Sequence, residues 1–102
     1  MTDITYLTEF PDYDADLPDL PNFADDSWHN DACPKLRRYL GMLYDPVIVT
    51  VWVDYADPER RESMKARRYT IVLTLTDENI DIAESDDLDQ IIDTLRALRW
   101  LD

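Results

Sequence analysis

VIVTVWVDY, residues 47–55, is the stretch that decides the fold. In an extended chain its odd-numbered positions, from Val47 to Tyr55, would line one face and Ile48, Thr50 and Trp52 the other. Its alternation and its β-branched residues favour a strand with one buried face. If nothing else covers the face of Ile48 and Trp52, that face is a surface for a partner, and a homodimer is one arrangement that fits.

Two further strands follow downstream. Tyr69–Thr76 (YTIVLTLT) alternates in the same way, and a turn at residues 76–79 leads into a short strand, Ile80–Ala83. Consecutive strands with short connections favour an antiparallel sheet. The sequence therefore predicts a three-strand meander.

The C-terminal residues predict an amphipathic helix that covers one face of this sheet. Ser85 and Asp86 are N-cap candidates, and Arg96 and Arg99 lie where the helix dipole favours cations. Apolar residues recur at helical spacing at Leu88, Ile91, Ile92, Leu95 and Leu98.

Two more elements are expected upstream. Pro34 suits the first turn of a helix, and Leu36, Tyr39, Leu40 and Leu43 then form an apolar stripe at helical spacing. Ile4–Phe10 is β-branched and aromatic and predicts a short N-terminal strand. The expected fold class is a small α+β domain spanning residues 1–102. It would consist of an antiparallel sheet packed by the C-terminal helix and a second short helix.

Charge is distributed unevenly along the chain. The 102 residues contain 23 Asp or Glu and ten Lys or Arg, for a formal net charge of −13. The first 34 residues carry nine acids and no Lys or Arg, whereas the remaining 14 acids and ten bases give only −4. An acidic surface repels nucleic acid and anionic membranes, and it attracts basic protein surfaces.

Residues 11–33 form an acidic segment with three prolines, and we expect an ordered, extended loop there. In an extended chain, Asp12, Asp14 and Asp16 would project from one side about 6.6–6.8 Å apart. Neighbouring phosphates on one DNA strand are separated by roughly 6–7 Å along the winding backbone. The candidate partner-binding acids are Asp12, Asp14, Asp16, Asp19, Asp25 and Asp26.

Aromatic residues recur among these acids. Tyr13, Phe23 and Trp28 are candidate anchors for a partner, because aromatic residues dominate many interfaces. The plainer interpretation is that such residues staple the loop onto the domain.

The sequence offers little for chemistry. One glycine excludes a P-loop and a dinucleotide-binding fingerprint. The lone His29 and Cys33 could form a nucleophilic pair, but no third group that would orient them is evident. Asp12-x-Asp14-x-Asp16 resembles the start of an EF-hand, yet Leu17 and Phe23 stand where Gly and Glu are needed. We expect no enzyme activity, no metal and no cofactor.

No signal peptide and no membrane span is recognisable in the sequence, so a cytoplasmic location is expected. In size and charge the chain is similar in type to phage-encoded anti-CRISPR and anti-restriction inhibitors. The first hypothesis is therefore a DNA mimic that occupies the nucleic-acid-binding surface of a basic protein. The alternatives are a solubility-adapted acidic domain from a halophilic or Asp-biased proteome, and an antitoxin or immunity-type subunit.

Overall fold

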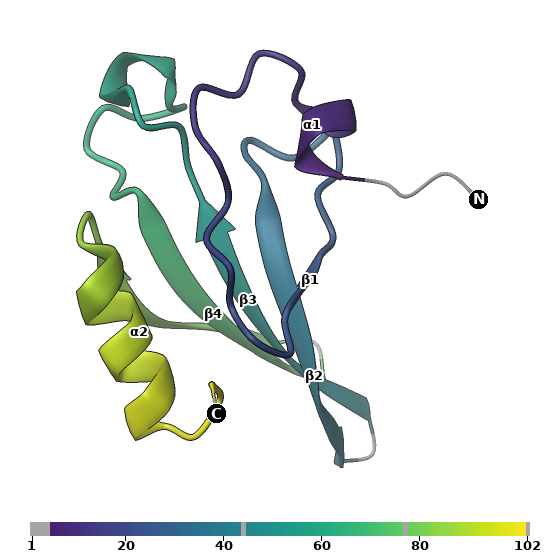
Figure 1. Ribbon diagram of the computed structural model, residues 1–102. Helices are drawn as coiled ribbons and strands as arrows, with labels where there is room; N and C mark the ends of the chain where they lie inside the picture. The colour runs from purple at the N-terminus through teal and green to yellow at the C-terminus, as the bar shows by residue number, and fades with distance from the viewer. Residues whose placement is uncertain (1–4, 44, 77, 102) are drawn as a thin grey trace.

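The fold is a five-stranded antiparallel sheet in the order β1-β2-β3-β4-β5, so each strand pairs with its neighbour in sequence. The computed structural model describes residues 5–43, 45–76 and 78–101. The strands are β1 (Ala24–Asp25), β2 (Lys35–Leu43), β3 (Asp45–Val53), β4 (Tyr69–Leu75) and β5 (Glu78–Ser85). The helices are α1 (Tyr6–Glu9), the 3-10 turn η1 (Pro58–Arg60) and α2 (Leu88–Ala97) (Figure 1).

The meander β3-β4-β5 and the C-terminal helix confirm the predicted α+β class. Val51 pairs with Ile71 across β3 and β4, and both side chains are fully buried. The prediction was coarser than the structure, because the sheet has five strands rather than three.

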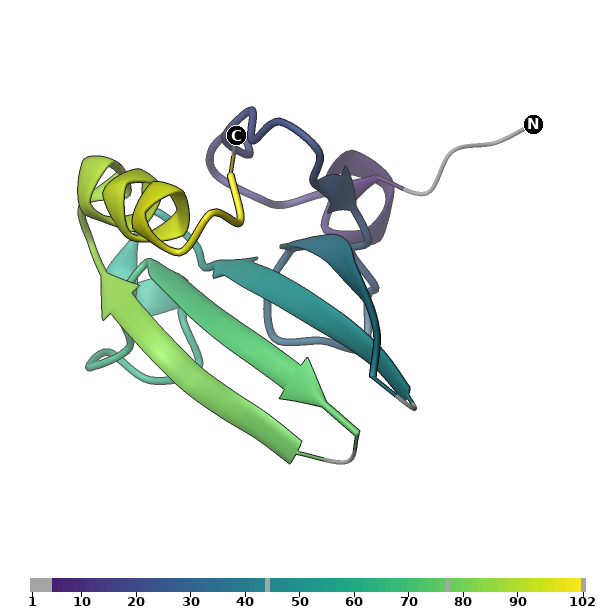
Figure 2. The same cartoon turned by 90° about the horizontal axis from the view of Figure 1, so that it is seen from below.

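One face of the sheet carries the core. Helix α2 packs Ile91 and Leu95 onto the buried side chains of β3 and β4. Leu20 from the acidic segment and Leu101 from the C-terminal end complete the same cluster. Figure 2 shows α2 and the N-terminal segment on this side of the sheet, with no helix of the described chain on the opposite side.

The prediction of a helix after Pro34 is wrong, because residues 35–43 form the long strand β2. Leu36 pairs with Val51 and faces the core, whereas Tyr39 is 67% exposed. β3 is buried and pairs with β4 along one edge only. Along its other edge the backbone N–H and C=O groups of β3 need a second strand as their hydrogen-bond partner. β2 satisfies these groups, and this requirement outweighs the helical spacing of the leucines.

Gly41 was the signal against a helix. It adopts φ +144 where the register between β2 and β3 shifts, and a strand glycine often marks such a bulge.

The expected N-terminal strand is also wrong in its described part, Thr5–Phe10, and Ile4 lies outside the described residues. Tyr6–Glu9 forms the single helical turn α1. The N–H of Tyr6 donates to the Asp25 carboxylate at 2.7 Å, which satisfies a group at the start of the turn. The outer strand that pairs with β2 is instead β1.

Candidate functional site

The acidic segment, residues 11–33, runs along the edge of the core with most of its acids exposed. From residue 12 to 17 the exposure alternates: Asp12, Asp14 and Asp16 are exposed, while Tyr13, Ala15 and Leu17 are half-buried. The backbone is extended only in part, because Pro11 and Asp12 lie in a turn, where the Tyr13 N–H donates to the Phe10 oxygen at 3.0 Å, and the chain bends at Ala15. The alternating exposure nevertheless places the acids toward solvent and the residues between them toward the domain. The three carboxylates therefore share the solvent side of the segment.

Tyr13 holds this segment to the sheet. Its ring lies 5.2 Å from the Tyr55 ring and 5.6 Å from the Tyr6 ring, measured between centroids. Its hydroxyl donates to the carbonyl oxygens of Val53 and Asp54 at 3.2 and 3.0 Å. Burial raises the pKa of Tyr13 to about 12, so the hydroxyl keeps its proton at neutral pH.

Asp14 is both an exposed carboxylate and a structural acceptor. The N–H groups of Ala56 and Asp57 donate to its two oxygens at 2.9 and 2.8 Å. Partial desolvation opposes ionisation, but these two hydrogen bonds outweigh it and lower the pKa of Asp14. Asp14 is therefore a fixed anion at neutral pH.

Asp12, Asp14 and Asp16 form a row of exposed acids, and tyrosine hydroxyls hold Asp12 and Asp16. The Tyr55 hydroxyl donates to Asp12 at 3.3 Å, and the Tyr6 hydroxyl donates to Asp16 at 3.1 Å. Arg60 also donates to the backbone oxygen of Asp12 at 2.6 Å. Each acid of the row thus has a donor that restricts where it points.

The three later acids lie in different environments. Asp25 is half-buried and accepts from the N–H and hydroxyl of Ser27 as well as from Tyr6. Asp26 is exposed and forms an ion pair with Arg37 of β2. Asp19 is exposed, and its side chain makes no hydrogen bond or ion pair within residues 5–43, 45–76 and 78–101.

The aromatic candidates also divide. Phe23 packs against the core and is half-buried, as is Tyr13. Trp28 is 50% exposed and makes an edge contact with the His29 ring at 5.7 Å. Among the three aromatics, Trp28 therefore presents the most surface to a partner.

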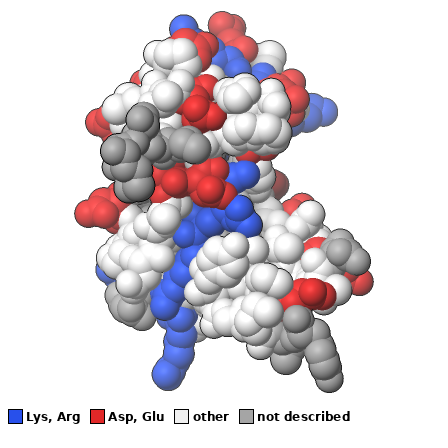
Figure 3. Space-filling view, turned by 90° about the vertical axis from the view of Figure 1, so that its right-hand side faces the viewer, with Lys and Arg blue, Asp and Glu red and all other residues white. Residues whose placement is uncertain are grey.

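The sequence missed the cations that the fold brings to this segment. Arg37 pairs with Asp26, and Lys35 pairs with Asp31 at 2.8 Å, both from β2. Figure 3 shows the result on the side of the molecule that carries α1, β1 and β2: Lys and Arg form a stripe directly below a group of Asp and Glu. Once residues 35–43 are recognised as a strand, their position next to the segment follows from the pairing of β1 with β2.

His29 and Cys33 do not form a nucleophilic pair. Cys33 is 5% exposed, and burial raises the pKa of its thiol to about 12, which keeps it protonated. The His29 ring points to Glu9 instead, with Nδ1 3.0 Å from the carboxylate. Over the described part of the chain, no group of three or more His, Cys, Asp or Glu is placed to hold a metal ion. No helix there has the length and apolarity needed to cross a bilayer.

Comparison of the chain with protein-family models, curated proteins and solved structures found no match. A functional conclusion must therefore come from the geometry of the acidic segment.

Proposed function

We propose that this chain is a non-enzymatic binding protein whose acidic segment occupies the nucleic-acid-binding surface of a basic partner. The observation that carries the proposal is the row of Asp12, Asp14 and Asp16, exposed on alternate residues and each held by a hydrogen-bond donor of the same chain. A row of fixed anions loses less conformational freedom on binding than a flexible acidic tail would.

The chemistry of the row suits arginine and lysine side chains. An ionised carboxylate accepts the paired N–H groups of a guanidinium much as a phosphate does. In an ideal extended segment alternate residues repeat at about 6.6–6.8 Å, close to the roughly 6–7 Å between successive phosphates of a DNA strand. The turn at Asp12 and the bend at Ala15 make the row depart from that ideal spacing. Arg and Lys side chains that bind phosphates in a basic groove could therefore bind the carboxylates of the row as well.

Other residues extend this surface to different degrees. Asp19 adds a carboxylate with no partner among the described side chains, and half-exposed Trp28 supplies an aromatic anchor. Asp25 contributes less, because its oxygens are occupied by donors within the fold. Asp26 shares its charge with Arg37.

The experiment compares two triple variants of equal charge. The first combines Asp12→Asn, Asp16→Asn and Asp19→Asn; an Asn side-chain oxygen can still accept from the two tyrosines. The second combines Asp45→Asn, Glu78→Gln and Asp93→Asn, three exposed acids remote in sequence from the segment. Each set changes the formal net charge from −13 to −13 + 3 = −10.

The partner is first captured from the native host on the immobilised chain and eluted with salt. A labelled DNA or RNA duplex bound to that partner is then displaced by the wild-type chain, and displacement is followed by fluorescence anisotropy at about 50 and 300 mM salt. We expect the first triple to weaken displacement at least tenfold at low salt, and the second triple to weaken it less than threefold. The proposal fails if the two triples behave alike, or if the partner and its nucleic acid bind the chain simultaneously.

A further inference from the structure

The sheet face opposite α2 lies outside the surface proposed for the basic partner. Cross-strand partners in an antiparallel sheet lie on the same face, so the register defines the members of this open face. Its middle row, for example, joins Arg37 of β2, Thr50 of β3, Val72 of β4 and Asp81 of β5. Figure 2 shows no helix over it in the part of the chain that the structure describes.

The centre of the open face is apolar or rich in threonine. Ile48 and Thr50 are only 8% and 7% exposed, so they present little surface of their own. Half-buried Trp52 lies beneath the ammonium group of Lys35, 5.1 Å from its ring centroid. Tyr39, at 67% exposed, is the most exposed aromatic residue of the face.

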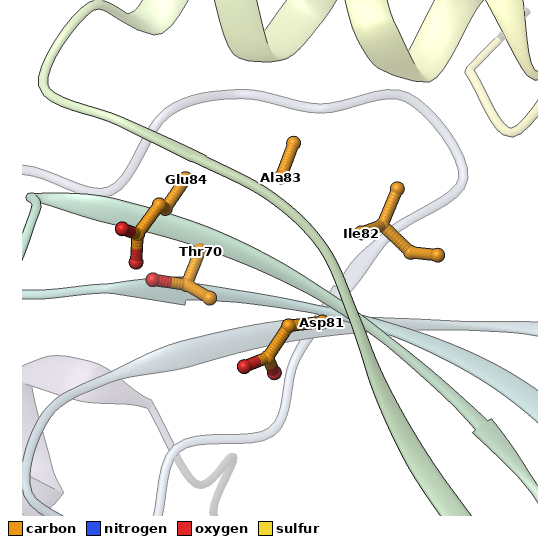
Figure 4. Close-up of a pocket in the computed structure, with 5 residues that line it drawn as sticks. All are labelled: Thr70, Asp81, Ile82, Ala83 and Glu84. Carbon is orange, nitrogen blue, oxygen red and sulfur yellow. The ribbon is translucent and has the colours of Figure 1, made fainter.

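The β5 edge of the open face carries acids without intramolecular partners. Asp81 and Glu84 are exposed, and neither carboxylate makes a hydrogen bond or ion pair to another described side chain. Figure 4 shows both carboxylates on the same side of the sheet as Thr70, while Ala83 points toward α2. A hollow of about 310 Å³ lies between these residues.

The β2 edge carries hydrogen-bond donors. Lys35 and Arg37 each make one intramolecular ion pair, with Asp31 and Asp26. A guanidinium has five N–H donors, so the Arg37 side chain, which is 32% exposed, has donors left over. The Lys35 side chain is only 15% exposed and presents less to a partner. The two sides of the open face are therefore unlike: β5 offers only carboxylate acceptors, whereas β2 offers the donors of Arg37 beside its partner Asp26.

We propose that the open face binds a second copy of this chain, with β2 of each copy over β5 of the other. Two identical faces can be stacked by a twofold axis that runs either along the strands or across them. An axis across the strands would place the unpaired acids of β5 opposite themselves. An axis along the strands, between β3 and β4, places them opposite Lys35 and Arg37, so the charges select this arrangement.

The same axis places each residue of β2 opposite a residue of β5 in the second copy, and β3 opposite β4. Arg37 faces Asp81 of the second copy, and Lys35 faces its Glu84. Tyr39 faces Asn79, which can hydrogen-bond to the phenol. At the centre, β3 of one copy lies over Thr70, Val72 and Thr74 of β4 in the other, and half-buried Trp52 supplies the accessible apolar surface of β3, because Ile48 and Thr50 are already buried.

The size of the face sets the strength of the dimer. Four strands about 4.8 Å apart and about six residues long present roughly 400 Å² per copy, or roughly 800 Å² in total. This lies below the range of stable standard interfaces. We therefore expect a dissociation constant of about 10–100 μM, and a dimer that forms only at high concentration.

The test uses Arg37→Glu and Asp81→Lys as two separate single variants, studied by sedimentation equilibrium between about 1 and 500 μM. Ionic strength is kept near 0.15 M, where a Debye length of about 8 Å screens the net charge of the chains. We expect the wild-type chain to dimerise and each variant alone to dimerise at least tenfold more weakly. An equimolar mixture should recover wild-type affinity, because both cross-interface pairs are then of opposite charge.

The proposal is overturned if the wild-type chain stays monomeric at 500 μM, or if the mixture is no tighter than the single variants. Asp93→Lys on α2 is the matched control for Asp81→Lys, since it makes the same charge change away from the open face and should leave the dissociation constant unchanged within twofold. Circular dichroism melting of each variant confirms that it folds. The inference does not rest on the proposed function, since binding of a basic partner by the acidic segment can succeed or fail independently of it.

Discussion

Replacing Tyr13 by alanine should lower the free energy of unfolding by about 2–4 kcal/mol and weaken partner binding by the acidic segment. Truncating a large aromatic side chain at a packed site costs about 3–5 kcal/mol, and the partial exposure of Tyr13 reduces that figure. The variant loses two ring contacts and the hydroxyl bonds to Val53 and Asp54. Urea unfolding followed by tryptophan fluorescence measures the stability change.

Two companion variants separate the causes. Tyr13→Phe removes only the hydroxyl and should lower the free energy of unfolding by about 0.5–1.5 kcal/mol. Tyr39→Ala truncates the same residue type at a 67% exposed position, and it should cost less than about 1 kcal/mol when measured at low micromolar concentration. If Tyr13→Ala is no more destabilising than Tyr39→Ala, Tyr13 does not hold the segment to the sheet.

Replacing Arg61 by alanine should lower the free energy of unfolding by about 2–4 kcal/mol, although Arg61 lies in an irregular connection between β3 and β4. Its side chain is 6% exposed. It donates to the backbone oxygens of Tyr55, Ala66 and Ala56 at 2.7, 2.8 and 3.3 Å. Removing a buried charged donor leaves these oxygens without their partner, which is costly away from water.

Arg67 is the control for this prediction, because its side chain is 56% exposed and pairs with Asp86 at 3.0 Å. Arg67→Ala should change the free energy of unfolding by less than about 0.5 kcal/mol, since exposed ion pairs contribute little. Equal losses for Arg61→Ala and Arg67→Ala in urea unfolding would contradict the role assigned to Arg61.

The parts of the fold that the sequence predicted are those where local pattern and burial agree. β3, β4 and α2 each show one apolar face at the period of their own secondary structure. β2 could not be recognised in this way, because Leu36, Tyr39, Leu40 and Leu43 match a helix and only pairing with β3 makes them a strand. Short-range periodicity does not show which strand edge needs a partner.

The sequence predicted that the acids of the candidate site share an exposed side. It did not predict which groups donate hydrogen bonds to them. The two-residue spacing of Asp12, Asp14 and Asp16 predicted that these acids share one side of an extended segment. The donors that hold these acids lie far along the chain, such as Tyr55 and the N–H groups of Ala56 and Asp57. The same holds for the ion pair of Asp26 with Arg37, which depends on the long-range pairing of β1 with β2.

The central claim is that the acidic segment is a fixed part of the fold rather than a flexible tail. The most direct measurement is the backbone N–H order parameter of residues 12–26 by NMR relaxation, compared with that of β3 in the same sample. We expect values near 0.85 at Asp12, Tyr13, Asp14 and Asp16, equal to those of β3. Values below about 0.6 at these four residues, beside a rigid β3, would contradict it.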